Sequence, residues 1–416
     1  MNTQFNCVGI DISKGKSTVS ILRPMGETVK APFEIQHTHH DLDSLVALIK
    51  NLDGDTRIVL ESTGKYHRPV LNHLVNEGFF VSEVNPKLIK DYGNAGNSLR
   101  RVKSDSKDSV RIAQFGIDKW FDLRRHETVD ELRDQLKTLN HQYIFYTQQR
   151  TAMINNLISI LDQTFPGINK LFTNYETAEG KLKWADFVSV FWHAECVSKK
   201  SLKAFTDQYI RWCRSNGYQT SIQKAKEIHE YSRQVLVSLP KNDFSKNLVR
   251  QAVDQLNNAR RTAASIKASM NELASKLPEY QVVMDMYGVG PALGPQLMAE
   301  IGDIRRFHSK GALTAFAGVD PGVNQSGSYD QKSVHASKKG SPCLRRTLFL
   351  IVSSILLNSP EDDPVYQFMD RKRREGKPFR VYMIAAANKF LRLYYGKVNS
   401  FLKARESLGV MIKPAN

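Results

Sequence analysis

In the first third of the chain, apolar runs are separated by short polar turns, a pattern typical of strands joined by crossover helices. Runs rich in β-branched residues predict strands at 7–12, 17–22, 29–36, 57–61 and 79–85, and helical periodicity predicts helices at 41–52, 66–76 and 110–115. Three strands therefore precede the first helix, and later strands alternate with helices. This order predicts an α/β domain with a partly parallel sheet and the topology of the ribonuclease H-like fold.

Beyond residue 127 the strand signals fade, and two long amphipathic helices are predicted. The first has apolar residues at three-four spacing over 132–160, and the second repeats them over 249–277 with several alanines that let a partner helix approach closely. We interpret the two as arms of an antiparallel coiled coil or a dimerisation bundle. For either arm alone, packing on the globular body agrees equally well with the pattern.

The segment between the arms carries three tryptophans among lysines and arginines: Trp184, Trp192 and Trp212. Aromatic rings beside basic side chains could stack on nucleic-acid bases. At helical spacing, however, such rings are more often core residues, and the sequence favours a small helical insert with an aromatic core.

Length and charge narrow the possible functions. The 416-residue chain exceeds the size of a single hydrophobic core, so at least two domains are expected. Its 59 Lys and Arg residues outnumber its 42 Asp and Glu residues, which gives a net charge of +17. This excess favours a partner that carries phosphates, with nucleic acid as the leading candidate. The alternative is a basic protein without such a partner.

Several classes of protein are excluded by composition. The longest apolar run, 348–357, is too short to cross a bilayer, and the N-terminus does not have the pattern of a secretory signal, so we expect a cytoplasmic protein. The four cysteines form no CxxC pair, which argues against a disulfide framework and a thiolate zinc site. We expect them to be small buried hydrophobic residues.

Four carboxylates are candidates for metal-dependent chemistry. Asp11 lies in the first strand and Glu61 ends the fourth, and in a ribonuclease H-like sheet these strands are neighbours. Asp105 and Asp108 share one face of a helix start, where the alternative roles are N-cap and capping-box partner. Converging carboxylates repel one another unless hard cations such as Mg²⁺ or Mn²⁺ neutralise them. Two such ions could stabilise the entering and leaving oxygens of a phosphodiester.

Motifs in both halves of the chain resemble those of the insertion-sequence-110-type transposases, a group that includes the Piv-type DNA invertases. The matching segments are GIDISK at 9–14, LESTG at 60–64, KSDSKD at 103–108, GVGP at 288–291, EIGD at 300–303, AFAGVDPGVNQSG at 315–327 and SKKGSPCLRR at 337–346. Their order along the chain is also the family's order.

The resemblance implies a recombinase with a RuvC-like domain that binds Mg²⁺ through the four acids. It further implies that a serine of the second domain attacks the DNA backbone and becomes covalently linked to it; this serine is Ser326, with Ser328 as the alternative. A serine hydroxyl needs activation to be a nucleophile, and most Ser-Gly pairs are plain surface turns.

Further residues are candidates for DNA binding. Gly288 and Gly290 open an apolar helix in the manner of a helix-hairpin-helix, whose backbone N–H groups bind phosphate. A Gly-Pro loop that simply begins a helix is the alternative. Two basic pairs also suit a phosphate backbone, although a solvated charged face has the same sequence: Lys338 and Lys339, and Arg345 and Arg346.

The resemblance also implies partners and an organisation. The expected partners are double-stranded target and donor DNA, a structured guide (bridge) RNA, and further copies of the chain in a homodimer or homotetramer, in the nucleoid of a bacterial cell. The expected parts are a RuvC-like catalytic domain (1–127), a coiled-coil arm (128–168), a helical insert (169–244), a second arm (245–279) and a mostly helical C-terminal domain with the serine (280–416). Compact family members have a shorter region between the arms, so the role of the insert is open.

Two other functions agree with part of the sequence. One is a Piv-like invertase or a metal-dependent junction nuclease that uses water as nucleophile, and the other is a non-catalytic nucleic-acid-binding protein. The four acids argue against the last, and Ser326 distinguishes a recombinase from a hydrolytic nuclease.

Overall fold

The computed structural model describes residues 5–62, 64, 66–95, 104–126, 130–173, 182–320, 325–326, 329–330 and 336–407. The chain divides into two compact units, Met1–Thr128 and Val129–Asn416, and each is described by itself. Within the described ranges, no helix combines the length and the apolar character needed to span a bilayer.

The first unit is built on a five-stranded sheet with the order β3-β2-β1-β4-β5. The strands are β1 (Phe5–Ile12), β2 (Lys16–Leu22), β3 (Thr28–Gln36), β4 (Asp55–Glu61) and β5 (Phe80–Val84). β2 runs antiparallel to both β1 and β3, whereas β4 is parallel to β1 and β5 is parallel to β4. This mixed sheet has the ribonuclease H-like topology that the sequence predicts.

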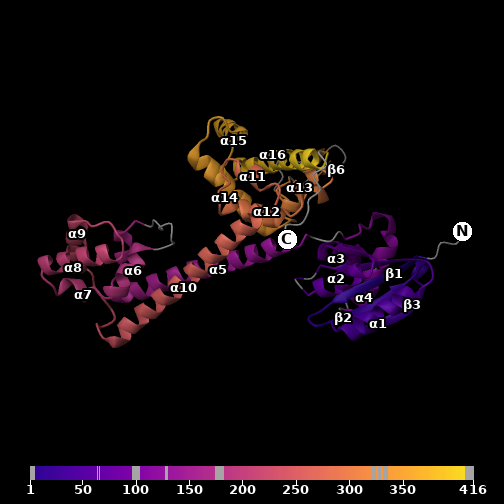
Figure 1. Cartoon of the computed structure of the whole chain (residues 1–416), viewed down its shortest axis with the longest axis horizontal. Helices are drawn as coiled ribbons and strands as arrows, with labels where there is room; N and C mark the ends of the chain where they lie inside the picture. Colours follow the sequence, from indigo (N-terminus) through magenta and orange to yellow (C-terminus); the bar gives the residue numbers. More distant parts are fainter. Residues whose placement is uncertain are drawn as a thin grey trace. The chain divides into compact units, whose positions relative to one another are not determined.

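Helices cover both faces of this sheet (Figure 1). Successive strand residues point to opposite faces, so each face has its own core. One face, which includes Val8 and Ile10, packs with α1 (His39–Lys50) and α2 (Arg68–Asn76). The other, which includes Cys7 and Val59, packs with α3 (Pro86–Ala95) and α4 (Asp105–Asp118).

Gly9 in β1 allows α4 to lie directly on the sheet. A Cβ atom at Gly9 would lie 2.8 Å from the Cα of Ala113 and would overlap the backbone oxygen of Ser109. Further along the same helix, a Cβ at Gly116 would overlap the sulfur of Cys7. Thus α4 crosses β1 from Gly9 towards Cys7, and its N-terminal turn extends beyond Gly9 in the opposite direction.

The second unit contains a pair of long helices, α5 (Glu131–Thr164) and α10 (Asp243–Ser275), which lie side by side (Figure 1). The start of α5 and the end of α10 share one core through Leu136 and Met270, and their other ends share a second core through Leu157 and Val249. The two helices therefore run antiparallel, as expected for the two predicted arms.

The insert between these helices is helical and has its own core. It contains α6 (Lys183–Val190), α7 (Glu195–Ser198), α8 (Leu202–Ser215) and α9 (Ile222–Ser232). Trp184, Trp192 and Trp212 are all buried, and the ring of Trp212 packs edge-on against Phe187 and Phe191. The tryptophans are core residues, as the sequence favoured.

The C-terminal part of this unit is mostly helical. It contains α11 (Tyr280–Met284), α12 (Leu293–Ile301), α13 (Lys310–Ala317), α14 (Pro342–Asn358), α15 (Pro364–Arg374), α16 (Phe379–Ser407) and the short strands β6 (Gln325–Ser326) and β7 (Tyr329–Asp330). All four cysteines are free; Cys7 and Cys213 are buried as predicted, whereas Cys196 and Cys343 are only half-buried.

Candidate active site

Two of the predicted carboxylates, Asp11 and Glu61, occupy matching positions on neighbouring strands. Ile10 of β1 pairs with Leu60 of β4, so Asp11 and Glu61 take the next position on two parallel strands. Matched residues of parallel strands point to the same face of a sheet. Gly9, two residues before Asp11, faces α4, so both half-buried carboxylates lie on the α4 face.

The other two predicted acids, Asp105 and Asp108, lie in the first turn of α4. The N-cap is Ser104, whose side chain accepts a hydrogen bond from the backbone N–H of Lys107, so the alternative role of Asp105 as N-cap is wrong. Asp108 accepts a hydrogen bond of 2.9 Å from Nη1 of Arg111. Neither acid is therefore needed to cap the helix.

The packing of α4 brings its first turn to the level of Asp11. Ser109 lies over Gly9, and the helix axis rises about 6 Å from Ser109 back to Asp105. Along β1, the two residues from Gly9 to Asp11 span about 7 Å in the same direction. All four predicted acids thus gather at one end of the sheet.

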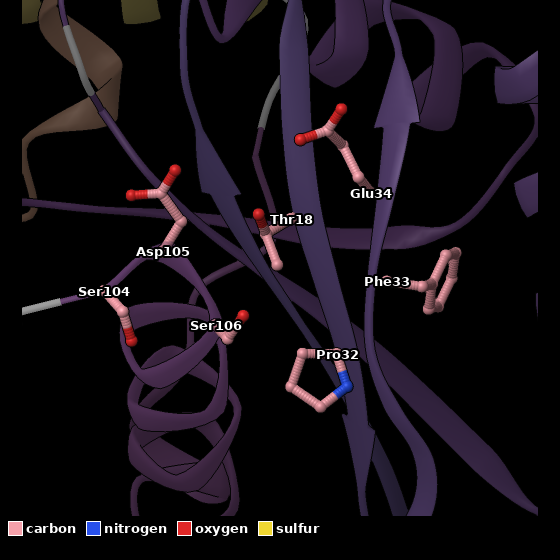
Figure 2. Close-up of a pocket in the computed structure, with 7 residues that line it drawn as sticks. All are labelled: Thr18, Pro32, Phe33, Glu34, Ser104, Asp105 and Ser106. Atoms are coloured by element: carbon pink, nitrogen blue, oxygen red, sulfur yellow. The ribbon is translucent and has the colours of Figure 1, made fainter.

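A pocket at this end contains a fifth carboxylate, Glu34. Thr18 of β2 pairs with Asp11 on one side and with Glu34 of β3 on the other, so these residues and Glu61 form one row across four strands. Figure 2 shows Asp105 and Glu34 on opposite sides of Thr18, around a cavity of about 430 Å³. The cavity is lined by Thr18, Pro32, Phe33, Glu34, Ser104, Asp105 and Ser106.

One basic side chain contacts this acidic row, and another contacts the first turn of α4. Nζ of Lys16 lies 2.6 Å from a carboxylate oxygen of Glu34, and Arg111 is paired with Asp108. The hydrogen bond to Glu34 and its charge raise the pKa of Lys16, and the charge of Asp105 raises it further. The same hydrogen bond lowers the pKa of Glu34. The carboxylate oxygens of the row are of the kind that hard divalent cations bind.

The predicted nucleophile lies on the second unit. Ser326 of β6 pairs antiparallel with Tyr329 of β7. Ser328 lies outside the described residues. Position 326 is therefore part of a short pair of antiparallel strands, and residues 320 and 336 are the nearest described positions before and after this pair.

The ends of this hairpin segment are held together by residues 316–320 and 337–341, which we call the clasp. Three of its hydrogen bonds run from Ser341 N to Phe316 O at 2.8 Å, from Lys338 N to Gly318 O at 3.1 Å and from Ser337 Oγ to Asp320 Oδ1 at 2.6 Å. A Cβ at Gly340 would lie 2.6 Å from the backbone nitrogen of Gly318, so the two segments of the clasp pack backbone to backbone.

The predicted basic residues differ in their surroundings. Lys338, Lys339 and Arg346 are exposed. Nη1 of Arg345 instead donates to the carbonyl oxygens of Ala317 and Gly340, at 3.1 and 2.8 Å. Arg345 therefore supports the clasp.

The two predicted phosphate-binding glycines also differ. Gly288 has a φ of +75°, and a Cβ there would lie 2.7 Å from the carbonyl oxygen of Ile351 in α14. Gly290 has open space around its Cα, and its carbonyl oxygen accepts hydrogen bonds from Leu293 and Gly294 at the start of α12. Close packing thus requires glycine at 288, whereas the surroundings of Gly290 leave room for a ligand.

Reasoning from the sequence missed Glu34 and Lys16. The sequence placed Lys16 at the end of the predicted turn at 13–16, directly before the second strand, and this was the one available signal. The pairing of Glu34 with Thr18 gave no signal in the sequence, because the register between β2 and β3 shifts near Ile21.

Comparisons with known proteins match both halves of the chain. A model of the IS110 DEDD transposases, described as "Transposase", matches residues 8–166, and a second model, "Transposase IS116/IS110/IS902 family", matches residues 280–367.

Two relatives come from insertion elements of Streptomyces. The IS110 43.6 kDa protein of Streptomyces coelicolor is 22% identical over 76% of this chain and 78% of its own length. The IS116 44.8 kDa protein of Streptomyces clavuligerus is 22% identical over 89% of this chain and 88% of its own length.

Among solved structures, the RuvC of T. thermophilus in complex with a Holliday junction substrate aligns with a TM-score of 0.22 and 10% identity, covering 28% of this chain and 96% of that chain. The family models that match the two units, and the relatives that span both of them, belong to one family. The chain belongs to the IS110 family of transposases.

Proposed function

We propose that this transposase cuts and rejoins DNA strands with a metal-dependent site formed by Asp11, Glu61, Asp105 and Asp108. The observation that carries the proposal is the placement of the four acids: two on adjacent parallel strands and two on the first turn of the helix that crosses them. An enzyme that acts on phosphodiesters needs positive charge where the strand is cut. Metal ions supply this charge, and carboxylates are the side chains that bind such ions.

The residues fit a hard divalent cation, Mg²⁺ or Mn²⁺. Every side chain of the set supplies carboxylate oxygens, which are the ligands that hard divalent cations prefer. When bound, such ions stabilise negative charge on the entering and leaving oxygens of a phosphodiester. Glu61 and Asp11 are fixed by the sheet, so they need little rearrangement to act as ligands.

We further propose that Ser326 is the nucleophile. Its hydroxyl loses a proton to a base, its oxygen bonds to phosphorus, and one bridging P–O bond breaks, whose oxygen takes up a proton. One phosphodiester replaces another, so the bond energy is conserved for rejoining. The clasp supports this role, because it fixes both ends of the short segment that carries the serine.

Binding to target and donor DNA would depend on basic side chains and on backbone N–H groups. Lys338, Lys339 and Arg346 are exposed and suit phosphate contacts, and Gly290 at the start of α12 leaves space for a phosphate as in a helix-hairpin-helix. We propose a structured guide RNA as a further partner, which the net charge of +17 supports.

We also propose that α5 and α10 form a coiled-coil arm that joins two or four copies of the chain. The middle of α5, including Tyr143 and Tyr146, is only half-buried by α10, which supports contact with a further helix. We likewise propose the division into a catalytic domain, a first arm, an insert, a second arm and a C-terminal domain, at 1–127, 128–168, 169–244, 245–279 and 280–416.

The acids are tested with isosteric variants in a DNA cleavage assay in Mg²⁺. Asp108→Asn should lower the cleavage rate by about 100-fold or more, because a metal ligand is lost. Asp118 at the other end of α4 accepts hydrogen bonds from Tyr92 and Gln114, and Asp118→Asn is the matched control that should retain activity. Wild-type cleavage by Asp108→Asn would remove this residue from the site.

The serine is tested by the covalent adduct. A denatured reaction should contain protein attached to one DNA end, and Ser326→Ala should lose the adduct while DNA binding remains. Peptide mapping of the adduct distinguishes Ser326 from Ser328. Wild-type cleavage by Ser326→Ala, with free ends and no adduct, would instead establish water as the nucleophile, and with it the hydrolytic nuclease.

A further inference from the structure

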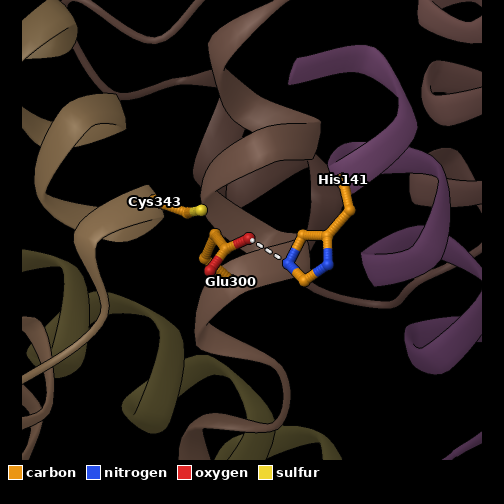
Figure 3. Close-up of side chains that lie close together, drawn as sticks. All are labelled: His141, Glu300 and Cys343. Atoms are coloured by element: carbon orange, nitrogen blue, oxygen red, sulfur yellow. Dashed lines mark ion pairs between the residues drawn. The ribbon is translucent and has the colours of Figure 1, made fainter. Parts of the chain in front are cut away.

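Three side chains that suit a transition metal meet in the second unit, and none of them is among the residues proposed for catalysis. They are His141 of α5, Glu300 of α12 and Cys343 of α14, and one ligand atom of each lies within 4.8 Å of the others (Figure 3). Positions 141 and 343 are far apart in sequence, so the packing of three helices creates the cluster.

The carboxylate of Glu300 is the fixed centre of the cluster. Its side chain is 3% exposed, and it accepts hydrogen bonds from Nδ2 of Asn140 at 2.8 Å and from Oγ of Ser341 at 3.0 Å. Burial raises the pKa of Glu300, but hydrogen bonds from His141, Asn140 and Ser341 outweigh this and leave the pKa below its ordinary value. A buried carboxylate whose position is fixed by two hydrogen bonds is a prepared ligand.

We propose that His141, Glu300 and Cys343 form a zinc site with a fourth position open to water. Imidazole, carboxylate and thiolate together suit zinc, and three protein ligands with one water is a common zinc arrangement. A nitrogen and an oxygen bound to one tetrahedral zinc lie about 3.3 Å apart. Nε2 of His141 already lies 3.5 Å from Oε1 of Glu300, so little movement is needed.

Charge balance supports the same ion. Binding requires Cys343 to release its thiol proton to solvent, after which the thiolate and the Glu300 carboxylate neutralise the two charges of the zinc ion. Burial and the charge of Glu300 raise the pKa of the free thiol above its ordinary value despite the opposing charges of Arg346 and Lys137, so the bound ion itself must displace the proton. The absence of a CxxC pair argues against zinc sites built from paired cysteines, and a site with a single cysteine ligand does not need such a pair.

A second observation points to a ligand beside Glu300. The side-chain amide oxygen Oδ1 of Asn140 is buried and has no hydrogen-bond donor among the residues that the structure describes. A buried acceptor without a donor costs free energy, and ordered water is the usual remedy. A zinc-bound water is a donor of the kind this oxygen lacks. His141 is 40% exposed, which leaves a route for the ion from solvent.

The site would join the long helix α5 to the clasp. Ser341, which donates to Glu300, also caps α14 and belongs to the clasp, and Cys343 lies in the first turn of the same helix. Zinc would therefore fix the base of the segment that carries position 326. Zinc binding at this site can be measured directly, without any assay of DNA cleavage.

Cobalt(II) tests the site in the purified full-length chain, because its spectrum reports both the ligands and the geometry. We expect one cobalt per chain with a thiolate-to-cobalt charge-transfer band and the intense visible bands of a tetrahedral site, which zinc abolishes by displacement. Cobalt held by the acids of the first unit has oxygen ligands alone and gives no charge-transfer band. Without that band at saturating cobalt, the proposal is wrong.

Variants locate the ligands. Cys343→Ser should lose the charge-transfer band, and Cys196→Ser is the matched control, since Cys196 is the other half-buried thiol and its variant should retain the band. His141→Gln, at a partly exposed position, should weaken cobalt binding at least tenfold and provides the test if Cys343→Ser does not fold. Zinc should raise the melting temperature of the wild type more than that of His141→Gln; equal shifts, or a band that survives Cys343→Ser, would overturn the assignment.

Discussion

Gly9→Ala is the most direct test of how α4 is seated on the sheet. The new Cβ would lie 2.8 Å from the Cα of Ala113, whereas carbon atoms in contact ordinarily lie about 3.5–4.0 Å apart. It would also overlap the backbone of Ser109. The new Cβ has a position fixed by the backbone of β1, and the atoms that it meets belong to the backbone of α4. No rotamer change can therefore relieve the contact, and α4 must move away from β1 by about 1 Å.

Two effects follow, one on stability and one on activity. Overpacking costs about 1–3 kcal/mol, and replacing a strand glycine by alanine returns about 0.5–1 kcal/mol, so unfolding of the first unit should become about 1 kcal/mol easier. That change corresponds to a fall in melting temperature of about 3–6 °C. Since Asp105 and Asp108 move with α4, a displacement of about 1 Å should slow DNA cleavage by about 100-fold.

Thermal unfolding of the full-length chain and cleavage at saturating DNA in Mg²⁺ measure the two effects. Gly93→Ala is the stability control, because a Cβ there meets only the flexible end of the Arg111 side chain, 2.6 Å away at Nε. The control should melt at or slightly above the wild-type temperature. If Gly9→Ala melts and cleaves like the wild type, α4 does not rest on β1 as described, and the derived position of Asp105 and Asp108 is wrong.

Three further predictions concern stability. Glu279→Gln should cost about 3 kcal/mol, measured by denaturant unfolding, because it removes the buried carboxylate partner of the Arg133 guanidinium, and the remaining ion pair with the more exposed Asp130, at 3.8 Å, is weaker. Two histidines lower the pKa of Glu83, so its contribution is present at neutral pH and is lost as pH falls below the ordinary value of about 4.5; Glu83→Gln should flatten the acid side of a plot of melting temperature against pH. Gly340→Ala should lower the melting temperature of the second unit, because its Cβ would overlap the backbone of Phe316, and an unchanged temperature would contradict the backbone packing of the clasp.

Local pattern was sufficient for the elements of the fold. Apolar alternation and the turn at 13–16 predicted all five strands of the first sheet in order, and three-four spacing predicted both long helices. These features depend on the periodicity of side chains along one segment, and each segment carries that information by itself. For the same reason, the strand order placed Asp11 and Glu61 on neighbouring strands before their register was known.

Contacts between distant segments depended on the tertiary structure. Glu34 joins the acidic row because the register of β2 and β3 shifts near Ile21, and one shifted residue changes which side chains are neighbours. The sequence suggested that Arg345 is an exposed basic residue for phosphate, whereas in the structure it donates hydrogen bonds to carbonyl oxygens of the clasp.

The sequence by itself therefore determined the α/β unit, the helical arms and the four acids as a set, because these follow from periodicity and residue type. Only the tertiary structure decided that Glu34 lies beside Thr18, that Ser104 and not Asp105 caps α4, and that His141, Glu300 and Cys343 meet. The physical reason is that such meetings depend on how closely backbones pack, at Gly9 above all, and close packing is a property of two segments together.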